Sequence, residues 1–366
     1  MTTKPITTRA LGRATLERQL LLRRRPMTVE DAVAHLVGLQ AQEVRAPYVT
    51  LAARLDGFTP AALSDALEER RVARIVTMRS TIHLHTADDC MTLRPLVQPA
   101  RAKELNIFRE GLAGVDLERL CAVTRPYVEE EPRTPKEIRE WLLGTWPDAD
   151  PQSLSAAARC LLPLVQVTPR ALWRRSGAVR LTTAEHWLHR EAVESPGHDE
   201  TILRYLRAFG PASVRDFQKW AGLTRTKPAF ERLRERLVTF RDEHGVELFD
   251  LPDAPRPDED VPAPPRLLAD FDNVLLSHAD RTRVVPEAHH GRNWAANAAY
   301  PAFLLDGFLA GLWTLKESAD GTRITLEPFG SPTRAQREEL VAEAERTAAV
   351  LEAPGPVTVD FATVRK

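Results

Sequence analysis

The run ETILRYLRAFGPASVRDFQKWAGLTRTKPAFERLRERLVTFRDEHGVELFD, residues 200–250, decides which fold the sequence predicts. Its first apolar residues have helical spacing, and Ser213 with Asp216 forms a capping box that begins a second helix, which Gly222 ends. A proline begins a third helix, and two β-rich runs then surround His244-Gly245 as in a hairpin. The expected elements are helices over 200–208, 213–221 and 229–237 and strands over 238–241 and 246–249. This is the order of elements in a winged helix-turn-helix motif.

Two earlier segments repeat this order more loosely. Thr28 with Asp31 resembles a capping box, and Thr134-Pro135-Lys136-Glu137 combines an N-cap with an N1 proline. The first segment is expected to contain helices over 15–22, 28–39, 48–55 and 59–71 and strands over 73–78 and 81–85. The second is expected to contain helices over 117–127, 134–143 and 153–162 and strands over 164–167 and 178–181. Three tandem winged helices predict an α+β protein with an extended, curved body that binds DNA.

The remaining sequence predicts a linker and a β-rich region. Residues 251–265 contain six prolines, which favours an extended linker or surface strap. Asp306-Gly307 between two apolar runs is the strongest hairpin signal in the chain. A second hairpin, a helix over 333–351 and a strand over 357–361 follow. The predicted domains are winged helix 1 with a glutamine motif (1–115), winged helix 2 (116–194), winged helix 3 (195–250), the linker (251–265) and a C-terminal β-rich region (266–366).

Composition narrows the cellular setting and the partners. The 366 residues include no apolar run long enough for a transmembrane helix, and the N-terminus lacks the apolar core of a secretory signal. Three widely spaced cysteines argue against a disulfide framework and a Cys-based zinc site, so we expect a cytoplasmic protein. Net charge is −1, but residues 4–25 carry seven cations against one acid. Arginine supplies most of the positive charge and suits phosphate recognition, although coding bias explains it equally well.

Several catalytic signatures are missing from the sequence. It contains no phosphate-binding glycine loop and no G-x-G-x-x-G, H-E-x-x-H or G-x-S-x-G motif. Nucleotide hydrolysis, dinucleotide redox chemistry, zinc proteolysis and α/β-hydrolase chemistry are therefore not expected.

Gln40-Ala41-Gln42 is the most informative short motif. The apolar residues from Val29 to Val37 share a helical face that Gln40 continues, where an aliphatic residue is expected. A buried carboxamide must find hydrogen-bond partners. If the helix unwinds after Gly38, both glutamines can face the same way and hold a water or a sugar, although an amide is not a base at neutral pH. The alternative is a turn whose glutamines cap loose backbone groups.

Two further clusters carry polar chemistry. Arg79, Thr81, His83 and His85 would share one face of a strand, where they could grip a phosphate or sugar or simply face solvent. The His-x-His pair could bind metal, but no third ligand is evident. Asp270, Asp272 and Asn273 precede Ser277-His278-Ala279-Asp280-Arg281, which predicts a structural polar network or a second catalytic shell.

Taken together, these residues resemble the AlkZ-type winged-helix DNA glycosylases. The resemblance rests on LVGLQAQ (36–42), RSTIHL (79–84), LLSHADR (275–281) and Asp306-Gly307 followed by Gly311-Leu312-Trp313. The motif of that family is glutamine, an aliphatic residue, then glutamine or aspartate. Gln40 and Gln42 fall on its two functional positions, while Ala41 is small for the middle one. The glutamine form is similar to that of the branch that unhooks DNA crosslinks.

The resemblance implies an enzyme, a substrate and a set of site residues. The enzyme would be a monofunctional DNA glycosylase that excises N7-alkylated purines and unhooks interstrand crosslinks, giving self-resistance to a DNA-alkylating natural product. Its partner would be double-stranded DNA carrying alkylated or crosslinked purines, with no cofactor, metal or membrane. By this resemblance the catalytic residues are Gln40 and Gln42, and the DNA-binding residues are Arg79, Thr81, His83, His278 and Arg281.

Two expectations qualify this reading. The lysine nearest to Gln40 along the chain is Lys4, so we expect no Schiff-base lyase activity. The alternative function is a non-catalytic winged-helix DNA-binding protein, either a regulator or a drug-sequestering resistance factor. Such regulators usually dimerise through a helix with a simple apolar stripe, which the sequence lacks, and we therefore expect a monomer.

Overall fold

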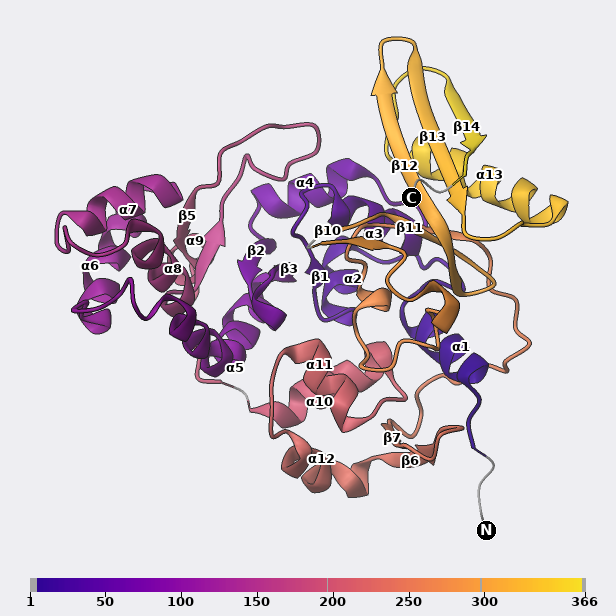
Figure 1. Ribbon diagram of the computed structural model, residues 1–366, viewed down its shortest axis with the longest axis horizontal. Coiled ribbons are helices and arrows are strands. Elements are labelled where there is room, and N and C mark those ends of the chain that lie inside the picture. Colours follow the sequence, from indigo (N-terminus) through magenta and orange to yellow (C-terminus); the bar gives the residue numbers. More distant parts are fainter. Residues whose placement is uncertain (1–4, 196, 297, 364–366) are drawn as a thin grey trace.

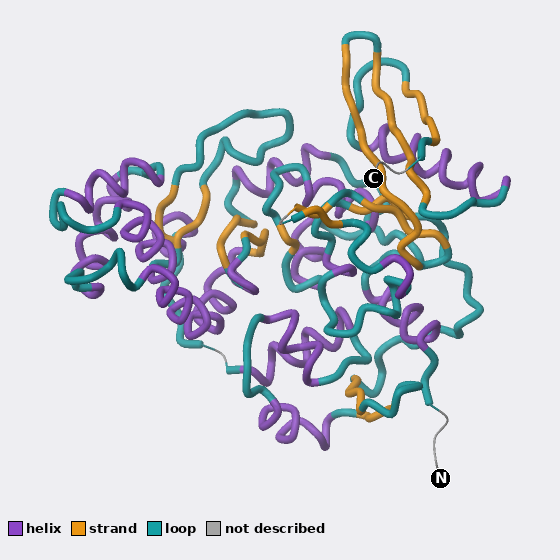
Figure 2. The backbone as a smooth tube through the Cα atoms, in the orientation of Figure 1, coloured by secondary structure: helices purple, strands orange, loops and turns teal. Residues whose placement is uncertain are grey.

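The computed structural model of the protein describes residues 5–195, 197–296 and 298–363 and has the predicted α+β composition. Figures 1 and 2 show a helical lobe of α6, α7 and α8 at one end and a C-terminal sheet with α13 projecting at another. The N-terminal helix α1 lies among elements from the second half of the chain. Segments that are far apart in the sequence therefore pack against one another, and the candidate active site lies where they meet.

Residues 5–104 form helices around three short strands. Thr28, Thr59 and Thr86 each begin a helix by accepting a hydrogen bond from the backbone N–H three residues later. The sequence predicts no helix between His85 and Leu117, yet an 18-residue helix with Pro95 and Pro99 inside begins at Ala87. The elements are α1 (Thr8–Arg18), α2 (Val29–His35), β1 (Leu39–Gln40), α3 (Ala46–Arg54), α4 (Pro60–Glu68), β2 (Val72–Val76), the 3-10 turn η1 (Met78–Ser80), β3 (Ile82–Thr86) and α5 (Ala87–Glu104).

The next segment completes a sheet that the first segment begins. Its elements are α6 (Leu117–Glu130), α7 (Pro135–Leu143), α8 (Pro151–Leu161), β4 (Leu164–Gln166), β5 (Leu181–Thr183) and α9 (Ala184–Leu188). The five strands lie in the order β1-β3-β2-β4-β5, and β2 pairs with β4 through Arg74 opposite Gln166. One sheet thus spans the domain boundary predicted at residue 116.

Residues 198–250 form the elements predicted for them, with ends shifted by a few residues. They are α10 (His198–Phe209), α11 (Val214–Ala221), α12 (Lys227–Leu233), β6 (Val238–Arg241) and β7 (Glu247–Asp250). The predicted Ser213–Asp216 capping box begins α11, and Gly222 ends it with φ +71°. Aromatic side chains of these helices pack into one core with Met78 and Val97 of the first segment. Full burial of each large apolar side chain contributes about 1.5–3 kcal/mol.

The proline-rich run 251–265 lies against α1. Arg18 donates to the backbone oxygen of Pro255, and Arg13 donates to that of Val261. The C-terminal sheet follows in the order β14-β13-β12-β11-β8, with the predicted Asp306-Gly307 turn between β11 and β12. Its elements are β8 (Arg266–Leu268), β11 (Ala302–Leu305), β12 (Phe308–Ser318), β13 (Gly321–Pro328), α13 (Arg334–Val350) and β14 (Val357–Phe361), with the small pair β9 (Trp294–Ala295) and β10 (Ala298–Ala299) between β8 and β11.

Two buried ion pairs fasten these parts together. Arg18 on α1 pairs with Asp250 at the end of β7, and Arg54 on α3 pairs with Asp272 after β8, with every one of these side chains at most 1 % exposed. Removing one partner of such a pair costs about 3–5 kcal/mol, because the other charge stays buried. The segment after β8 is therefore held firmly against the first helical segment.

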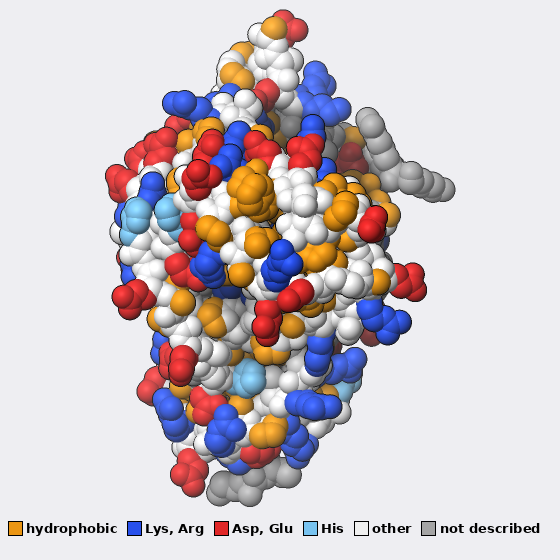
Figure 3. Space-filling model, turned by 90° about the vertical axis from the view of Figure 1, so that its left-hand side faces the viewer, with side chains coloured by type: hydrophobic (Ala, Val, Ile, Leu, Met, Phe, Trp, Pro, Cys, Tyr) orange, Lys and Arg blue, Asp and Glu red, His pale blue; other side chains and the backbone are white. Residues whose placement is uncertain are grey.

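No single charge dominates the surface at the end of the molecule that carries α6, α7 and α8. Figure 3 shows the end of the molecule formed by the α6–α8 lobe, where acidic and basic side chains are interspersed. Within the described ranges, no helix is both long and apolar enough to cross a membrane.

Candidate active site

Gln40 lies at the end of a short strand and Gln42 in the bend that follows it, not at the end of a helix. The prediction of a helix through Leu39 is wrong, because α2 ends at His35 and Leu39–Gln40 forms β1. Val37 (φ 55°) and Gly38 (φ 93°) turn the chain between the two elements. A Cβ on Gly38 would lie 2.2 Å from Cε1 of His85, so only glycine has both the conformation and the space.

Pairing between β1 and β3 fixes the position of Gln40. Gln40 lies opposite His83, and the N–H of Ala41 extends the ladder by donating to Ile82. The chain bends after Ala41, and the carbonyl of Ala41 accepts a hydrogen bond from Arg74. Gln40 is 6 % exposed whereas Gln42 is exposed, so the two glutamines have different surroundings.

The Gln40 carboxamide is oriented by a cation. Its Oε1 accepts a hydrogen bond from Nη2 of Arg79 over 2.8 Å, and its backbone N–H donates to Oδ1 of Asn273 over 3.4 Å. Because a guanidinium can only donate, the oxygen must face Arg79 and the amide nitrogen must point elsewhere. That nitrogen has no hydrogen-bond partner among the described residues, so it remains free to donate to a ligand.

Arg79 itself is tied into the protein. It has φ 53° in the turn η1, and its Nη1 donates to the carbonyl of Trp220 at the end of α11 over 2.6 Å. Gly222 allows this approach, since a Cβ there would lie 2.9 Å from the backbone nitrogen of Arg79. Burial lowers the pKa of Arg79 to about 10, which still leaves it a cation at neutral pH. The guanidinium joins α11 to Gln40, and the Arg79 side chain remains partly exposed.

The histidines beside Arg79 are also internal. The prediction of an exposed strand face over 79–85 is wrong. The strand begins only at Ile82, and His83 and His85 are at most 2 % exposed. His83 bonds the carbonyl of Thr81 through Nδ1, which leaves Nε2 as an acceptor 3.5 Å from Arg79. Burial lowers the pKa of His83, and that of His85 to about 4, so both rings are neutral at pH 7. Thr81 is partly exposed.

The predicted polar cluster after β8 holds the glutamine strand in place. Asn273 accepts from the N–H of Gln40 and donates to the carbonyl of Gly38 over 2.7 Å, while Asp272 is fixed by Arg54. These bonds make the cluster a polar network that supports the strand carrying Gln40. They also bring Asp270, two residues earlier, to the chain that carries the motif.

His278 was predicted to contact DNA, and the structure places it in the interior. The side chain is 1 % exposed and Nε2 bonds the carbonyl of Phe209 over 3.0 Å. Burial lowers its pKa to about 3, with Arg283 adding to the effect, so the ring is neutral at pH 7. Its neighbour Ala279 donates from the backbone to Asp216. His278 thus fastens the C-terminal region to α10 and α11, whereas Arg281 is partly exposed.

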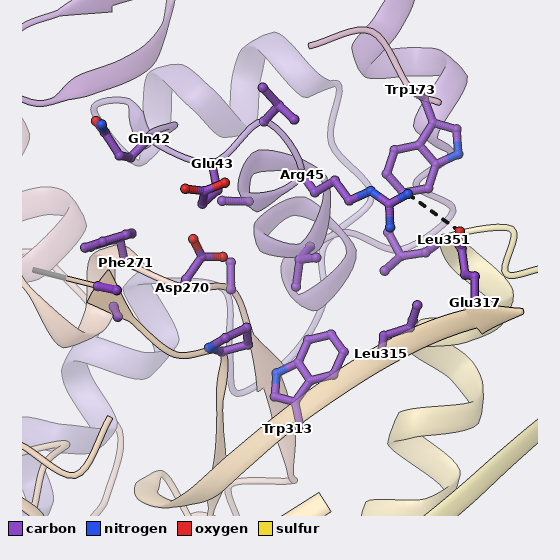
Figure 4. A pocket seen from close by; sticks show the side chains of 17 residues that line it. Gln42, Glu43, Arg45, Trp173, Asp270, Phe271, Trp313, Leu315, Glu317 and Leu351 are labelled. Carbon is purple, nitrogen blue, oxygen red and sulfur yellow. Dashed lines mark ion pairs between the residues drawn. The ribbon is translucent and has the colours of Figure 1, made fainter. Parts of the chain in front are cut away.

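Gln42 lies at the border of two cavities of opposite charge. We call the first the acidic cavity; it encloses about 660 Å³, and Figure 4 shows its labelled side chains. We call the second the basic cavity; it encloses about 270 Å³. The acidic cavity is lined by Gln42, Glu43, Arg45, Trp173, Asp270, Phe271, Trp313 and Glu317, among others. The basic cavity is lined by Gln42, Arg74, Gln166, Arg159 and Arg170, among others.

Sequence reasoning missed the acidic cavity. Trp173 comes from the loop between β4 and β5, Trp313 from β12 and Asp270 from the turn after β8. Only the cluster around Asp270 was noticed, and nothing in the spacing of the tryptophans linked them to it. Within the described ranges, no group of three His, Cys, Asp or Glu side chains could hold a metal ion.

The comparisons agree with this architecture. A sequence model of the family described as DNA glycosylase AlkZ-like matches residues 33–350, so the chain belongs to the AlkZ-like DNA glycosylase family. The interstrand DNA cross-link repair glycosylase of Streptomyces sahachiroi is 23 % identical over 357 residues, covering 91 % of this chain and 93 % of that protein. The solved structure of Streptomyces sahachiroi DNA glycosylase AlkZ matches with a TM-score of 0.76 at 18 % identity, covering 97 % of this chain and all of that one. The structural likeness shows a common fold.

Proposed function

We propose that this protein is a monofunctional DNA glycosylase that hydrolyses the N-glycosidic bond of N7-alkylated purines and unhooks interstrand crosslinks made through them. Its cellular role would be self-resistance to a DNA-alkylating natural product. One observation carries the proposal: a carboxamide oriented by a partly buried cation lies two residues before a second, exposed carboxamide at the border of two charged cavities. The similar Streptomyces sahachiroi protein bears the name of a cross-link repair glycosylase, which supports the crosslink reading.

Hydrolysis of this N-glycosidic bond does not require a strong general base from the protein. Alkylation at N7 makes the purine a cation, so the bond from N9 to the sugar is already weak. When that bond breaks, its electron pair neutralises the purine and the sugar becomes oxocarbenium-like. In this mechanism Gln42 orients the attacking water, and the free amide nitrogen of Gln40 donates to an oxygen of the substrate. Carboxamides suffice here because positioning contributes more than proton abstraction.

The helical segments would hold the DNA. We interpret residues 1–115, 116–194 and 195–250 as three winged-helix units of a monomer that surrounds double-stranded DNA carrying the lesion. Among the predicted DNA-binding residues, Arg79, Thr81 and Arg281 are partly exposed, whereas His83 and His278 are buried. Arg79, His83 and His278 are assigned positioning roles, because their polar atoms bond within the protein.

Base excision from a duplex that contains N7-methylguanine tests the proposal. Gln42→Ala and Gln40→Ala should each lower the single-turnover rate at least about 100-fold while DNA affinity stays within about twofold, because the groups act in the transition state. Gln152→Ala, an exposed glutamine on α8, is the matched control. Release of base at the wild-type rate by both variants would show that the active site lies elsewhere. Tight binding without base release by the wild type would favour the non-catalytic, drug-sequestering alternative.

A further inference from the structure

The charges on the two sides of Gln42 are not balanced within the protein. In the acidic cavity, Glu317 is paired with Arg45 and Arg174. Glu43 and Asp270 form no ion pair with any described residue, and Figure 4 shows their carboxylates facing each other. Two like charges held this close attract a cation, and the cavity contains none that is not already paired.

Asp270 shows most clearly that the acidic cavity lacks a partner. Its Oδ2 is buried and accepts no hydrogen bond from the described residues. Burial, together with the charges of Glu43 and Asp272, raises the pKa of Asp270 to about 6. The next residue, Phe271, has φ 58°, a left-handed conformation that is strained for a bulky residue. A strained backbone therefore holds an unsatisfied carboxylate at the cavity wall.

The other walls of the acidic cavity suit a flat, positively charged ring. Trp173 and Trp313 both line it, and their indole rings lie on the side away from the labelled Gln42 in Figure 4. Aromatic faces attract cations, and they also stack on planar bases. The volume of about 660 Å³ lies in the range of small-molecule sites.

The basic cavity carries positive charges that are not balanced within the protein. Arg74, Arg159 and Arg170 form no ion pair with the described residues, and the Nε atoms of Arg74 and Arg170 are buried without a hydrogen-bond partner. Burial and the charge of Arg170 lower the pKa of Arg74 to about 10. An anion in the cavity would relieve this repulsion, as a phosphate does beside clustered arginines.

We propose that the acidic cavity binds the alkylated purine as a cation while the basic cavity holds the adjoining phosphate, which places the sugar at Gln42. Gln42 lies between the acidic cavity and the basic cavity, just as the sugar of a nucleotide lies between the base and the phosphate. The assignment rests on the proposed glycosylase function and adds a substrate preference to it. Once the glycosidic bond breaks, the base loses its charge, so the acidic cavity holds the product less tightly than the substrate.

Nucleoside binding tests the cavity without any need for catalysis. 7-Methylguanosine, whose imidazole ring is cationic, and neutral guanosine are titrated at pH 7 with EDTA present, and tryptophan fluorescence or calorimetry reports binding. We expect wild-type protein to bind 7-methylguanosine at least about fivefold more tightly than guanosine. Asp270→Asn should reduce that ratio to about twofold or less, while Asp253→Asn, a matched change on an exposed acid, should leave it unchanged. Trp313→Phe, which keeps an aromatic ring, should retain the preference.

The outcomes separate this inference from the proposed function. Equal binding of the two nucleosides by wild type, or an undiminished preference in Asp270→Asn, would overturn the cavity assignment even if Gln42→Ala still abolished base excision. A preference that depends on Asp270 supports the assignment. If it persisted while Gln40→Ala and Gln42→Ala released base normally, the catalytic role of the glutamines would fail, not the cation site.

Discussion

The guanidinium of Arg79 donates to the Gln40 carboxamide over 2.8 Å across 39 residues of sequence, and through its other nitrogen it donates to the last turn of α11. One side chain thus connects the motif of the first segment to a helix of the third. The orientation of Gln40 depends on how α11 is seated, since Trp220 supplies the carbonyl that holds Arg79 in place. This link makes Arg79 the first residue to test outside the motif itself.

Arg79→Lys should lower base excision with little change in DNA affinity. Lysine keeps the charge but lacks the planar fork whose two terminal nitrogens reach Gln40 and Trp220 separately, and a misplacement of about 1 Å can cost about 100-fold in rate. Single-turnover excision and the salt dependence of binding measure the two effects. A shallower salt slope for Arg79→Lys or Arg79→Ala would show that Arg79 contacts phosphate after all. Arg281→Ala is the comparison variant, for which a shallower slope is expected.

Gly38→Ala should destabilise the protein through two separable causes. The residue has φ 93°, and an added Cβ would lie 2.2 Å from the His85 ring. Gly57 has φ 69° with nothing within 4 Å of an added Cβ, so Gly57→Ala measures the conformational cost alone. We expect about 1 kcal/mol for Gly57→Ala and at least about 2 kcal/mol more for Gly38→Ala, measured by denaturant unfolding. Equal losses would mean that the His85 ring moves aside freely.

The local parts of this architecture could be read from the sequence because short-range chemistry fixes them. The capping boxes at Thr134 and Ser213 begin the helices predicted there, and Asp306-Gly307 turns between β11 and β12. The helix α5 was not predicted, because Pro95 and Pro99 interrupt its pattern and its burial is not confined to one face. The end of α2 was misplaced because Val37, a β-branched residue, adopts a left-handed conformation that its side chain disfavours.

The site could be read only in part, for a different reason. The glutamines were recognised as a short motif, whereas the roles of Arg79, His83 and His278 depend on which distant backbone groups they reach. Type and spacing of residues suggest polarity but do not say whether a polar atom faces DNA or a carbonyl of the same chain. The acidic cavity depends on three separate regions meeting, which no local pattern encodes.

Asp270→Asn should stabilise the protein at neutral pH. The carboxyl has a pKa raised to about 6 in the folded protein against 3.8 ordinarily, so the folded state binds its proton more tightly. Folding stability from this group is therefore greatest below about pH 4, declines between pH 4 and 6, and is lowest above pH 6. The negative charges of Glu43 and Asp272 also raise the pKa of Asp270, while Arg45 is paired with Glu317.

Thermal unfolding against pH measures this effect. After allowance for solvent screening at a partly exposed group, the gain in Asp270→Asn is about 1–2 kcal/mol at pH 7.5 and near zero at pH 4. Asp253→Asn should show no such difference between the two pH values. A loss of stability in Asp270→Asn at pH 7.5 would indicate that Asp270 is paired in solution, contrary to its unsatisfied position here.

The products of the reaction provide the last prediction. Water attacking the sugar should leave an uncleaved strand with an abasic site, and the released base should carry the alkyl group. No lysine is among the residues that line the acidic and basic cavities, so borohydride should trap no enzyme–DNA adduct. Chelators should not slow the reaction, because the described residues include no cluster of three metal-binding side chains. A crosslinked duplex treated with the enzyme should therefore separate into two full-length strands on a denaturing gel, with or without EDTA. Strand cleavage together with a trapped adduct would refute the hydrolytic mechanism, since that pair of products requires an amine nucleophile.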